Sequence, residues 1–600
     1  MAAGVAGGVE GGGRGTLAIL MVRGDLEQEL GRRVAAAVRS AFDLAISPEE
    51  AVIRPAAPER QADYQSNAAM PLGRRLQMPS TQVAAQIVER LHVGDMLEPA
   101  RSEGTGFVNL QLRRDWLERH TTSLARDDRL GVLPAAPPRR AVIDYSAPNV
   151  AKEMHAGHLR TTTIGDSIAR LLRFKRHEVI PQNHLGDWGT PFGMLLEHMM
   201  DQGWDGGDEL AIADLDRFYQ EARLKFDSDQ AFVERARRRV VSLQSGDPQT
   251  LALWSGLVAE SERHFQKVYD LMGVPLTPAD YRGESFYNPM LADVANELES
   301  QGLAVLSQGA LCVFPPGFTG RDGEPLPLIV RYSSGGYGYG MTDLVAIRYR
   351  ARELHADDIL YVVGAEQRLH LEMIFAVARM AGWLHEGSRV EHVSFGLVLG
   401  PDRKRIRSRS GDSIKLIELL EEAIDRAAAV VAERSELTSA ERHRVARAVG
   451  VGAVKYADLS GDRDKDYVFD WDRMLAMEGN TAVYLQYANA RVQSVIRKAG
   501  GAPQQGTPVV LAEAAERALA LKLARFPTAV EAAIAHLQPH RLCTYLYETA
   551  VAFSMFYESC PILGAESEEL RASRLVLCGL TSRVMVQGLD LLGIEAPERL

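Results

Sequence analysis

Short apolar runs alternate with amphipathic stretches over the middle of this chain. Apolar runs predict five strands, at residues 141–146, 178–182, 328–331, 359–363 and 393–399. The segments between these runs have helical periodicity. Strands that alternate with helices predict a parallel, doubly wound α/β sheet, and ligands bind such a sheet at the carboxyl ends of its strands. We therefore expect a binding site at that edge.

The N-terminal pattern differs from the middle of the chain. Residues 1–16 are rich in glycine and hold little that could pack, which predicts a disordered tail. Residues 17–115 predict a separate α/β domain, with amphipathic helices near 26–42 and 81–91 and a strand at 106–112.

The later part of the chain is mostly helical. A Pro-rich linker at 134–138 marks the boundary before the sheet-forming domain. A long charged stretch at about 201–302 has a helical pattern and interrupts that domain. Beyond residue 414 the pattern is almost wholly helical, which predicts a terminal bundle.

Composition narrows the class of protein. The chain has 46% apolar and 24% charged residues, as globular proteins have, and its longest early apolar run, Leu17 to Val22, is too short to span a membrane. We expect a cytoplasmic protein without a membrane function. The net charge of −11 argues against indiscriminate binding of nucleic acid but allows a local basic surface. Four cysteines without metal-ligand spacing are expected to be reduced and structural: Cys312, Cys543, Cys560 and Cys578.

The segment 146–160 carries the strongest chemical signal. His155 and His158 stand at a predicted turn from strand to helix, with Gly157 between them. A helix N-terminus offers unpaired N–H groups to phosphate, glycine allows close approach, and Lys152 adds a further cation. The pattern favours a nucleoside triphosphate site over the alternative, a structural pair of histidines at a helix start.

The wider block resembles one family. The segment reads Ser-x-Pro-Asn-x-Ala-Lys before His-Ala-Gly-His, and residues 183–193 read Asn-His-Leu-Gly-Asp-Trp-Gly-Thr-Pro-Phe-Gly. Both are similar to the arginyl-tRNA synthetase family of class I aminoacyl-tRNA synthetases. The resemblance implies an enzyme that activates L-arginine with ATP to arginyl-adenylate and transfers arginine to the 3′-terminal adenosine of tRNA(Arg).

The same resemblance implies a domain order. A Rossmann-like catalytic domain at 138–412 carries a helical insertion at about 201–325. A helical connection at 413–470 leads to an all-α anticodon-binding domain at 471–600. The α/β domain at 17–115 contacts the outer corner of tRNA or, alternatively, only supports the catalytic core. We expect a monomer, with Mg²⁺ carried by ATP and no dedicated protein metal site.

The resemblance assigns the catalytic and ATP-binding residues. His155, His158 and Lys152 stabilise the transferring phosphate, and Gly157 lies under the adenine. The usual Lys-Met-Ser-Lys-Ser loop is missing, and a run of basic residues at 403–409 follows the strand in its place. That run is either the ATP loop, a solvated charge cluster or an RNA contact. The remaining ATP-binding assignments are Val398, Arg407 and Arg409.

Arginine recognition calls for carboxylates, because a planar guanidinium pairs with two oxygens at once. Asp343 follows Tyr339 by four residues, so the two side chains share a helical face. The glycine-rich run before them leads into this helix and is not read as a phosphate loop. By resemblance, six residues bind arginine: Asp144, Ser146, Asn149, Tyr339, Asp343 and Gln367.

The C-terminal bundle supplies candidate tRNA contacts, because aromatic and arginine side chains stack on unpaired bases. We predict contacts from Tyr484, Asn489 and Arg491, while aromatic residues at helical spacing, such as Tyr484 and Tyr487, fit a core equally well. Three alternatives stay open: a paralogue that binds tRNA or arginine without charging, an active duplicate with a specialised role, and a class I enzyme for another amino acid.

Overall fold

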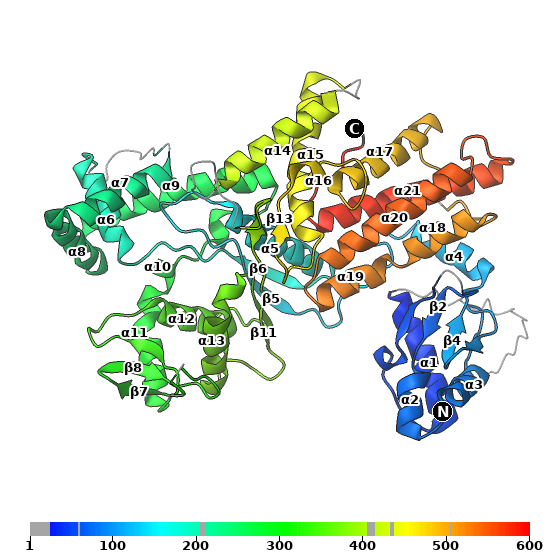
Figure 1. The fold of residues 1–600 in the computed structure, drawn as a ribbon, viewed down its shortest axis with the longest axis horizontal. Coiled ribbons are helices and arrows are strands. Elements are labelled where there is room, and N and C mark those ends of the chain that lie inside the picture. The colour runs from blue at the N-terminus through cyan, green and yellow to red at the C-terminus, as the bar shows by residue number, and fades with distance from the viewer. Residues whose placement is uncertain are drawn as a thin grey trace, which may run out of the picture. The chain divides into compact units, whose positions relative to one another are not determined.

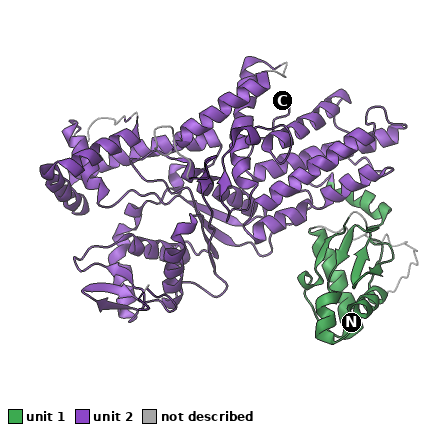
Figure 2. Ribbon diagram, in the orientation of Figure 1, with its two compact units in different colours: residues 1–124 green, residues 125–600 purple. Residues whose placement is uncertain are grey.

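The computed structural model describes residues 24–57, 60–204, 212, 214–320, 322–404, 414–432, 437–504 and 506–600. The glycine-rich tail predicted at 1–16 lies outside these residues, as do Arg407 and Arg409. The chain divides into two compact units, residues 1–124 and 125–600 (Figure 2).

The first unit is an α/β domain, as its sequence pattern predicts. Its antiparallel sheet has the order β1-β2-β4-β3. Asp25 caps the first helix by accepting a hydrogen bond from the Glu27 amide at 2.8 Å, and the helix buries an apolar face that includes Leu30 and Val34. The elements are α1 (Leu26–Phe42), β1 (Ile53–Pro55), β2 (Tyr64–Ser66), α2 (Ala69–Leu76), α3 (Ser80–Arg90), β3 (Arg101–Glu103), β4 (Phe107–Leu110) and α4 (Arg114–Leu124).

The second unit is built on a four-stranded parallel sheet. Its strands are β5 (Arg140–Asp144), β6 (Glu178–Gln182), β10 (Asp358–Tyr361) and β11 (Arg389–His392). The spatial order is β11-β10-β5-β6, so the chain winds one way from β5 to β6 and then returns to β10 on the other side of β5. This reversal makes the carboxyl ends of β5 and β10 the expected place for a ligand. The predicted doubly wound sheet is confirmed.

Helices pack on both sides of this sheet. Helix α5 (Ala156–Phe174) connects β5 to β6 and also contacts the C-terminal helices. On the other side, the main core joins Val142 and Ile359 of the sheet to Leu344 of α12 (Tyr339–Arg352) and Ile374 of α13 (Arg368–Met380). Since strands packed on both faces are largely apolar, the two central strands, β5 and β10, lie in apolar runs of the sequence, whereas β11 at the edge has the polar sequence Arg-Val-Glu-His.

Two predicted strands lie elsewhere. The run at Leu328–Arg331 is β9, which joins β7 (Ala304–Ser307) and β8 (Ala310–Val313) in a separate antiparallel sheet, because the neighbouring hairpin supplies its partner. The prediction that it continues the parallel sheet is wrong.

The predicted strand at 393–399 is also displaced. The parallel strand β11 comes earlier, and only Val398–Leu399 (β12) pairs again, with Tyr467–Val468 (β13). Between β11 and β12 the chain leaves the sheet, because its backbone bonds instead to the loop that contains Arg463 and Asp466. The Gly396 amide donates to the Arg463 carbonyl, and the Leu397 amide donates to the Asp466 carboxylate.

The charged stretch after β6 is helical, as predicted, and has a core of its own that includes Phe192, Phe232 and Leu253. Its helices are α6 (Pro191–Asp201), α7 (Leu215–Ser228), α8 (Gln230–Gln244), α9 (Pro248–Met272), α10 (Glu284–Tyr287) and α11 (Leu291–Ser300).

The C-terminal part is a helical bundle, as predicted, with α17, α20 and α21 packed side by side (Figure 1). All four cysteines are buried and free. No helix among the described residues is both long and apolar enough to cross a membrane. The helices are α14 (Leu416–Ala432), α15 (Ser439–Leu459), α16 (Trp471–Met474), α17 (Ala482–Lys498), α18 (Ala514–Ala524), α19 (Phe526–Ala535), α20 (His540–Ser559) and α21 (Glu568–Leu591).

Candidate active site

A cavity of about 490 Å³ opens at the carboxyl ends of β5 and β10. It lies at the point where the strand order reverses, as the fold class requires. Half of its wall comes from the loop after β5 and the start of α5, and the other half from the segments after β10 and β11. Seven residues predicted for the site line it: Ser146, Asn149, His155, Gly157, His158, Gln367 and Val398.

The two histidines of this cavity organise the start of α5. His155 is the N-cap residue, and its Nδ1 accepts a hydrogen bond from the Gly157 amide at 3.0 Å. His158 Nδ1 accepts from the His155 amide at 3.1 Å. Because both Nδ1 atoms are acceptors, the proton of each neutral ring lies on Nε2, from which it can be donated to a phosphate oxygen.

The charge state of His158 follows from its surroundings. Burial, and then the neighbouring His155, lower the pKa of His158 to about 3. The two ring centroids are 4.1 Å apart. Two positive rings at this distance would repel each other, so His158 acts as a neutral hydrogen-bond donor at physiological pH.

The chain that follows the basic run is attached to this motif. The Ala156 amide donates to the Ile414 carbonyl at 3.1 Å, and the Leu416 amide donates to the Met154 carbonyl at 2.7 Å. Residues 414–416 are therefore held beside His155. Arg407 and Arg409 themselves lie outside the described residues, while Arg403 is described and exposed.

Lys152 does not line the cavity. Its Nζ lies 4.5 Å from the centroid of the Tyr219 ring on α7, in a cation–π contact. The structure thus places this lysine beside the insertion, although it is only three residues from His155.

Asp144 is the last residue of β5, does not line the cavity, and already forms an ion pair within the protein. Its Oδ2 lies 2.8 Å from Nη2 of Arg350, whose side chain is 0% exposed. The Nε of Arg350 donates to Gln182 at 2.7 Å, and its guanidinium lies 4.9 Å from the centroid of the Tyr361 ring. An internal arginine therefore occupies one oxygen of a carboxylate that the sequence assigns to the substrate.

Tyr339 and Asp343 share a face of α12, as predicted, but they lie outside the lining of the cavity. His370 of α13 links them: its Nε2 is 2.6 Å from Asp343 Oδ2, and its ring centroid is 4.7 Å from that of Tyr339. His370 is not among the residues predicted for the site, although it lies three residues after Gln367.

Glu284 is a second residue near this site that the sequence did not predict. Burial, together with the nearby carboxylates of Asp187 and Asp343, raises the pKa of Glu284 to about 7. It begins the four-residue helix α10, so no periodic pattern marks it. A half-buried acid that interacts with Asp343 extends the negative region on this side of the site.

The predicted tRNA contacts divide into two kinds. Asn489 is 0% exposed, donates to the Pro597 carbonyl at 3.3 Å and accepts from Ser582 at 2.7 Å. Its prediction as an RNA contact is wrong, because its polar atoms are used inside the bundle. Tyr484 is half-buried against Tyr547, with ring centroids 5.8 Å apart.

Arg491 is also half-buried, and its guanidinium lies over two rings. The distance to the ring centroid is 5.1 Å for Tyr487 and 5.3 Å for Tyr557. Tyr557 is 40% exposed, so this stack reaches the surface.

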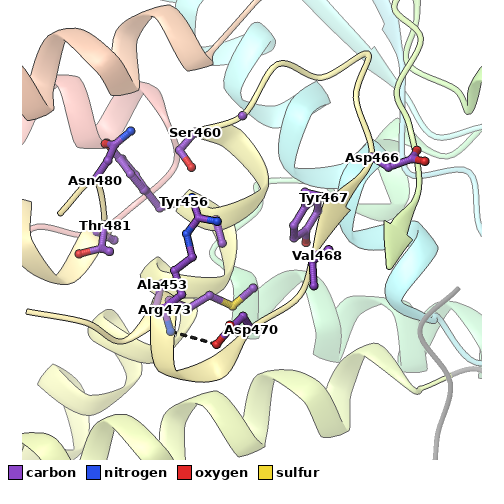
Figure 3. A pocket seen from close by; sticks show the side chains of 14 residues that line it. Ala453, Tyr456, Ser460, Asp466, Tyr467, Val468, Asp470, Arg473, Asn480 and Thr481 are labelled. Atoms are coloured by element: carbon purple, nitrogen blue, oxygen red, sulfur yellow. Dashed lines mark hydrogen bonds between the residues drawn. The ribbon is translucent and has the colours of Figure 1, made fainter. Parts of the chain in front are cut away.

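A second cavity, of about 340 Å³, lies in the C-terminal part, with Tyr456 and Asn480 on one side and Tyr467 and Val468 on the other (Figure 3). The polar groups around it bond to each other: Tyr456 donates to Asn480 at 2.6 Å, and the Arg473 amide donates to Asp470 at 3.1 Å. It contains no residue predicted for the reaction.

Three family models together match most of the chain. Residues 121–471 match the family of tRNA synthetases class I (R), catalytic domain, residues 485–600 the DALR anticodon binding domain, and residues 28–112 the arginyl tRNA synthetase N terminal domain.

Two curated relatives are each called arginine–tRNA ligase. The protein of Thermobifida fusca is 52% identical and covers 96% of this chain and 100% of its own length. The protein of Frankia casuarinae is 49% identical and covers 95% of this chain and 98% of its own length.

Solved structures give the same result. The arginyl-tRNA synthetase of Plasmodium falciparum superposes with a TM-score of 0.84 at 27% identity, and that of Thermus thermophilus with 0.79 at 25% identity. Each comparison covers 96% of this chain and 100% of the other. On the combined strength of its cavity, its family matches and its relatives, the chain belongs to the arginyl-tRNA synthetase family of class I arginine–tRNA ligases.

Proposed function

We propose that this chain activates L-arginine with ATP and esterifies the 3′-terminal adenosine of tRNA(Arg), using the cavity after β5 and β10. In the first step, the carboxylate of arginine attacks the α-phosphate and diphosphate leaves. The observation that supports this site most strongly is the meeting of the His155–His158 pair with Ser146, Asn149 and Gln367 in one cavity at the strand reversal. Such a site catalyses by orientation and by charge stabilisation, without a covalent nucleophile.

On the nucleotide side, the Nε2 donors of His155 and His158 and the N-terminus of α5 meet the phosphates. Gly157 and Val398 line the wall that faces the nucleoside. Lys152 and the pair Arg407 and Arg409 add positive charge to the nucleotide side. Among the described residues that line the cavity, Glu366 alone is acidic, so phosphate oxygens and water hold the Mg²⁺ that accompanies ATP.

On the arginine side, Asp343 receives the guanidinium. His370 holds one of its oxygens at 2.6 Å and leaves the other for the substrate. Glu284 adds negative charge, Tyr339 flanks the site, and the second oxygen of Asp144 completes it. Ser146, Asn149 and Gln367 contact the amino and carboxyl groups.

For tRNA, we propose that Tyr484 and Arg491 stack on bases of the anticodon arm. The partly exposed stack of Arg491 with Tyr557 supports this assignment. The unit at residues 1–124 contacts the outer corner of tRNA. The corresponding expectation is a monomer that acts in the cytoplasm.

The test is charging of total tRNA by the purified protein with each labelled amino acid in turn. We expect arginine alone to be attached. No charging with arginine while ATP binds would favour the alternative of a paralogue that binds without charging.

The same assay tests the arginine side. Asp343→Asn is expected to lower kcat/KM for arginine by about 100-fold or more, because an isosteric neutral group no longer pairs with a guanidinium. The KM for ATP should not change. The matched control is Asp293→Asn, which makes the same change at an exposed position of α11. An equal loss in both variants, or no loss in Asp343→Asn, would remove Asp343 from the arginine site.

A further inference from the structure

Helix α9 of the insertion presents one face to the loop that precedes the His motif. Ser261 Oγ accepts from the Ala151 amide at 3.0 Å, His264 Nδ1 lies 3.1 Å from Glu153 Oε1, and the Tyr269 hydroxyl lies 2.8 Å from Ser146 Oγ. A helix places residues at these spacings on adjoining parts of its surface. The loop is therefore folded along α9.

This loop needs such support, because its backbone is strained. Ser146, Ala147 and Ala151 all have positive φ, at 76°, 46° and 62°. Residues with a Cβ adopt this conformation only where the surroundings enforce it. Here the Ala147 amide donates to Asn183 at 2.9 Å, and α9 provides the contacts to the other two residues.

The hydroxyl of Tyr269 belongs to a buried chain of hydrogen bonds. Asn183 Nδ2 donates to it at 2.9 Å, and Ser146 Oγ is 2.8 Å away. Thr162 Oγ1 lies 2.9 Å from Ser146 Oγ and 2.6 Å from the His158 carbonyl oxygen, which can only accept. The position of Thr162 Oγ1 allows it to donate to either neighbour, but it has one hydrogen, and the shorter contact is to the His158 carbonyl oxygen, which can only accept. We therefore assign that hydrogen to His158. The remaining contacts are then satisfied if Ser146 donates to Thr162 and Tyr269 donates to Ser146.

This direction decides what Ser146 can offer a ligand. Its one hydrogen is used on Thr162, and one lone pair accepts from Tyr269. The group left over is a second lone pair, which accepts from an ammonium N–H and repels a carboxylate oxygen. Ser146 lines the cavity at 1% exposure, so this lone pair is held in one orientation.

We propose that Tyr269 is a positioning residue of the amino-acid site: it fixes the Ser146 hydroxyl as an acceptor for the α-ammonium group of arginine. The inference rests on the proposed function, which assigns Ser146 to the bound amino acid. Burial raises the pKa of the Tyr269 phenol, so Tyr269 stays a neutral donor at any physiological pH.

The end of α9 is anchored close to Tyr269. Three cationic side chains donate to its last carbonyl groups: Arg447 to Leu271 at 3.3 Å, Lys455 to Met272 at 3.1 Å and Arg170 to Gly273 at 3.1 Å. Cations at a helix C-terminus also interact favourably with its dipole. Because Met272 is three residues from Tyr269, this anchor keeps the phenol in place.

Tyr269→Phe tests the proposal by removing only the hydroxyl. We expect the KM for arginine to rise about tenfold, which corresponds to the loss of one buried hydrogen bond. The KM for ATP, and kcat at saturating arginine, should change less than twofold. The matched control is Tyr281→Phe, because Tyr281 is also buried and donates to Gln266 of the same helix at 3.3 Å. An unchanged KM for arginine in Tyr269→Phe, or an equal rise in both variants, would overturn the proposal.

Two arginine analogues provide a readout that a merely structural role would not move. Inhibition by 5-guanidinopentanoate, which lacks the α-amino group, should be the same in Tyr269→Phe and in the unmodified chain. Inhibition by agmatine, which keeps the amine and lacks the carboxylate, should weaken about as much as arginine binding. Equal weakening of both analogues would show a general disturbance of the cavity and contradict the proposal.

Ser146→Ala separates this inference from the proposed function. If Ser146→Ala leaves the KM for arginine unchanged, the assignment of Ser146 to the amino acid fails. If Ser146→Ala weakens arginine and Tyr269→Phe does not, only the positioning role fails. If both variants weaken arginine binding, the double variant should have the same KM for arginine as Ser146→Ala alone, because Tyr269 acts through Ser146.

Discussion

The proposed nucleotide side and the proposed arginine side of this site are built differently. The nucleotide side is one continuous segment, in which two imidazoles and a helix N-terminus offer neutral donors within four residues. The arginine side gathers Asp144, Glu284, Asp343 and His370 from four distant segments. Its charges are half-buried and held by partners such as Arg350. The proposed phosphate site is thus a local property of one segment, whereas the proposed guanidinium site depends on tertiary contacts.

The largest effect is expected on the free energy of unfolding, when Asp144 of the arginine side is replaced. Asp144→Ala leaves the fully buried Arg350 without its carboxylate partner. A buried charge without a partner costs about 3–5 kcal/mol. We expect the free energy of unfolding to fall by about that amount in a urea titration, and the double variant Asp144→Ala/Arg350→Met to recover most of it.

The control for this change is an exposed ion pair on the same sheet. Arg140 and Glu178 are 2.9 Å apart, but the Glu178 side chain is 57% exposed. Glu178→Ala should lower the free energy of unfolding by less than about 1 kcal/mol, because solvent screens the pair. If Asp144→Ala lowered the free energy of unfolding no more than Glu178→Ala does, the proposed difference between the buried and the exposed ion pair would be wrong.

A smaller effect is expected in the pH dependence of arginine binding. Since the pKa of Glu284 is raised to about 7, it loses its negative charge as pH falls from 8 to 6. Guanidinium binding favours the anion, so the KM for arginine should rise over this range, by up to about tenfold per pH unit below the pKa. Glu284→Gln should remove this part of the pH dependence. A KM for arginine that is flat from pH 8 to 6, or a slope unchanged in Glu284→Gln, would contradict the prediction.

The smallest effect is expected on the nucleotide side, where His158 should not titrate. Its pKa is lowered to about 3, so NMR spectra of the ¹⁵N-labelled protein should show a neutral ring from pH 5 to 8. His264 is the internal comparison: its hydrogen bond to Glu153 raises its pKa, so it should titrate above its ordinary value. His158→Gln and His264→Gln assign the signals. A midpoint for His158 near 6.5 would contradict the prediction.

The sequence pattern predicted local features well. The helices at Leu26–Phe42 and after His155 appear where their periodicity places them, because one buried face decides an amphipathic helix. The shared face of Tyr339 and Asp343 also followed from spacing alone. Pairing did not: an apolar run such as Leu328–Arg331 predicts a strand without naming its partner.

Burial of polar residues was predicted less well. Asn489 follows the buried Leu485 by four residues and precedes the buried Val492 by three, so the helical period already placed it on the inner face of α17. No comparable signal marks Glu284 or His370, whose roles depend on which segments fold against Asp343.

The sequence by itself indicated the family, three of the four strands of the parallel sheet and the proposed nucleotide side, because these depend on short motifs and on periodicity along one segment. The tertiary structure alone decided that Asp144 carries an internal arginine, that His370 and Glu284 join Asp343, and that Tyr269 reaches Ser146. Each of these contacts joins residues more than twenty positions apart. Their energies depend on burial and on hydrogen-bond direction, which exist only once the chain has folded.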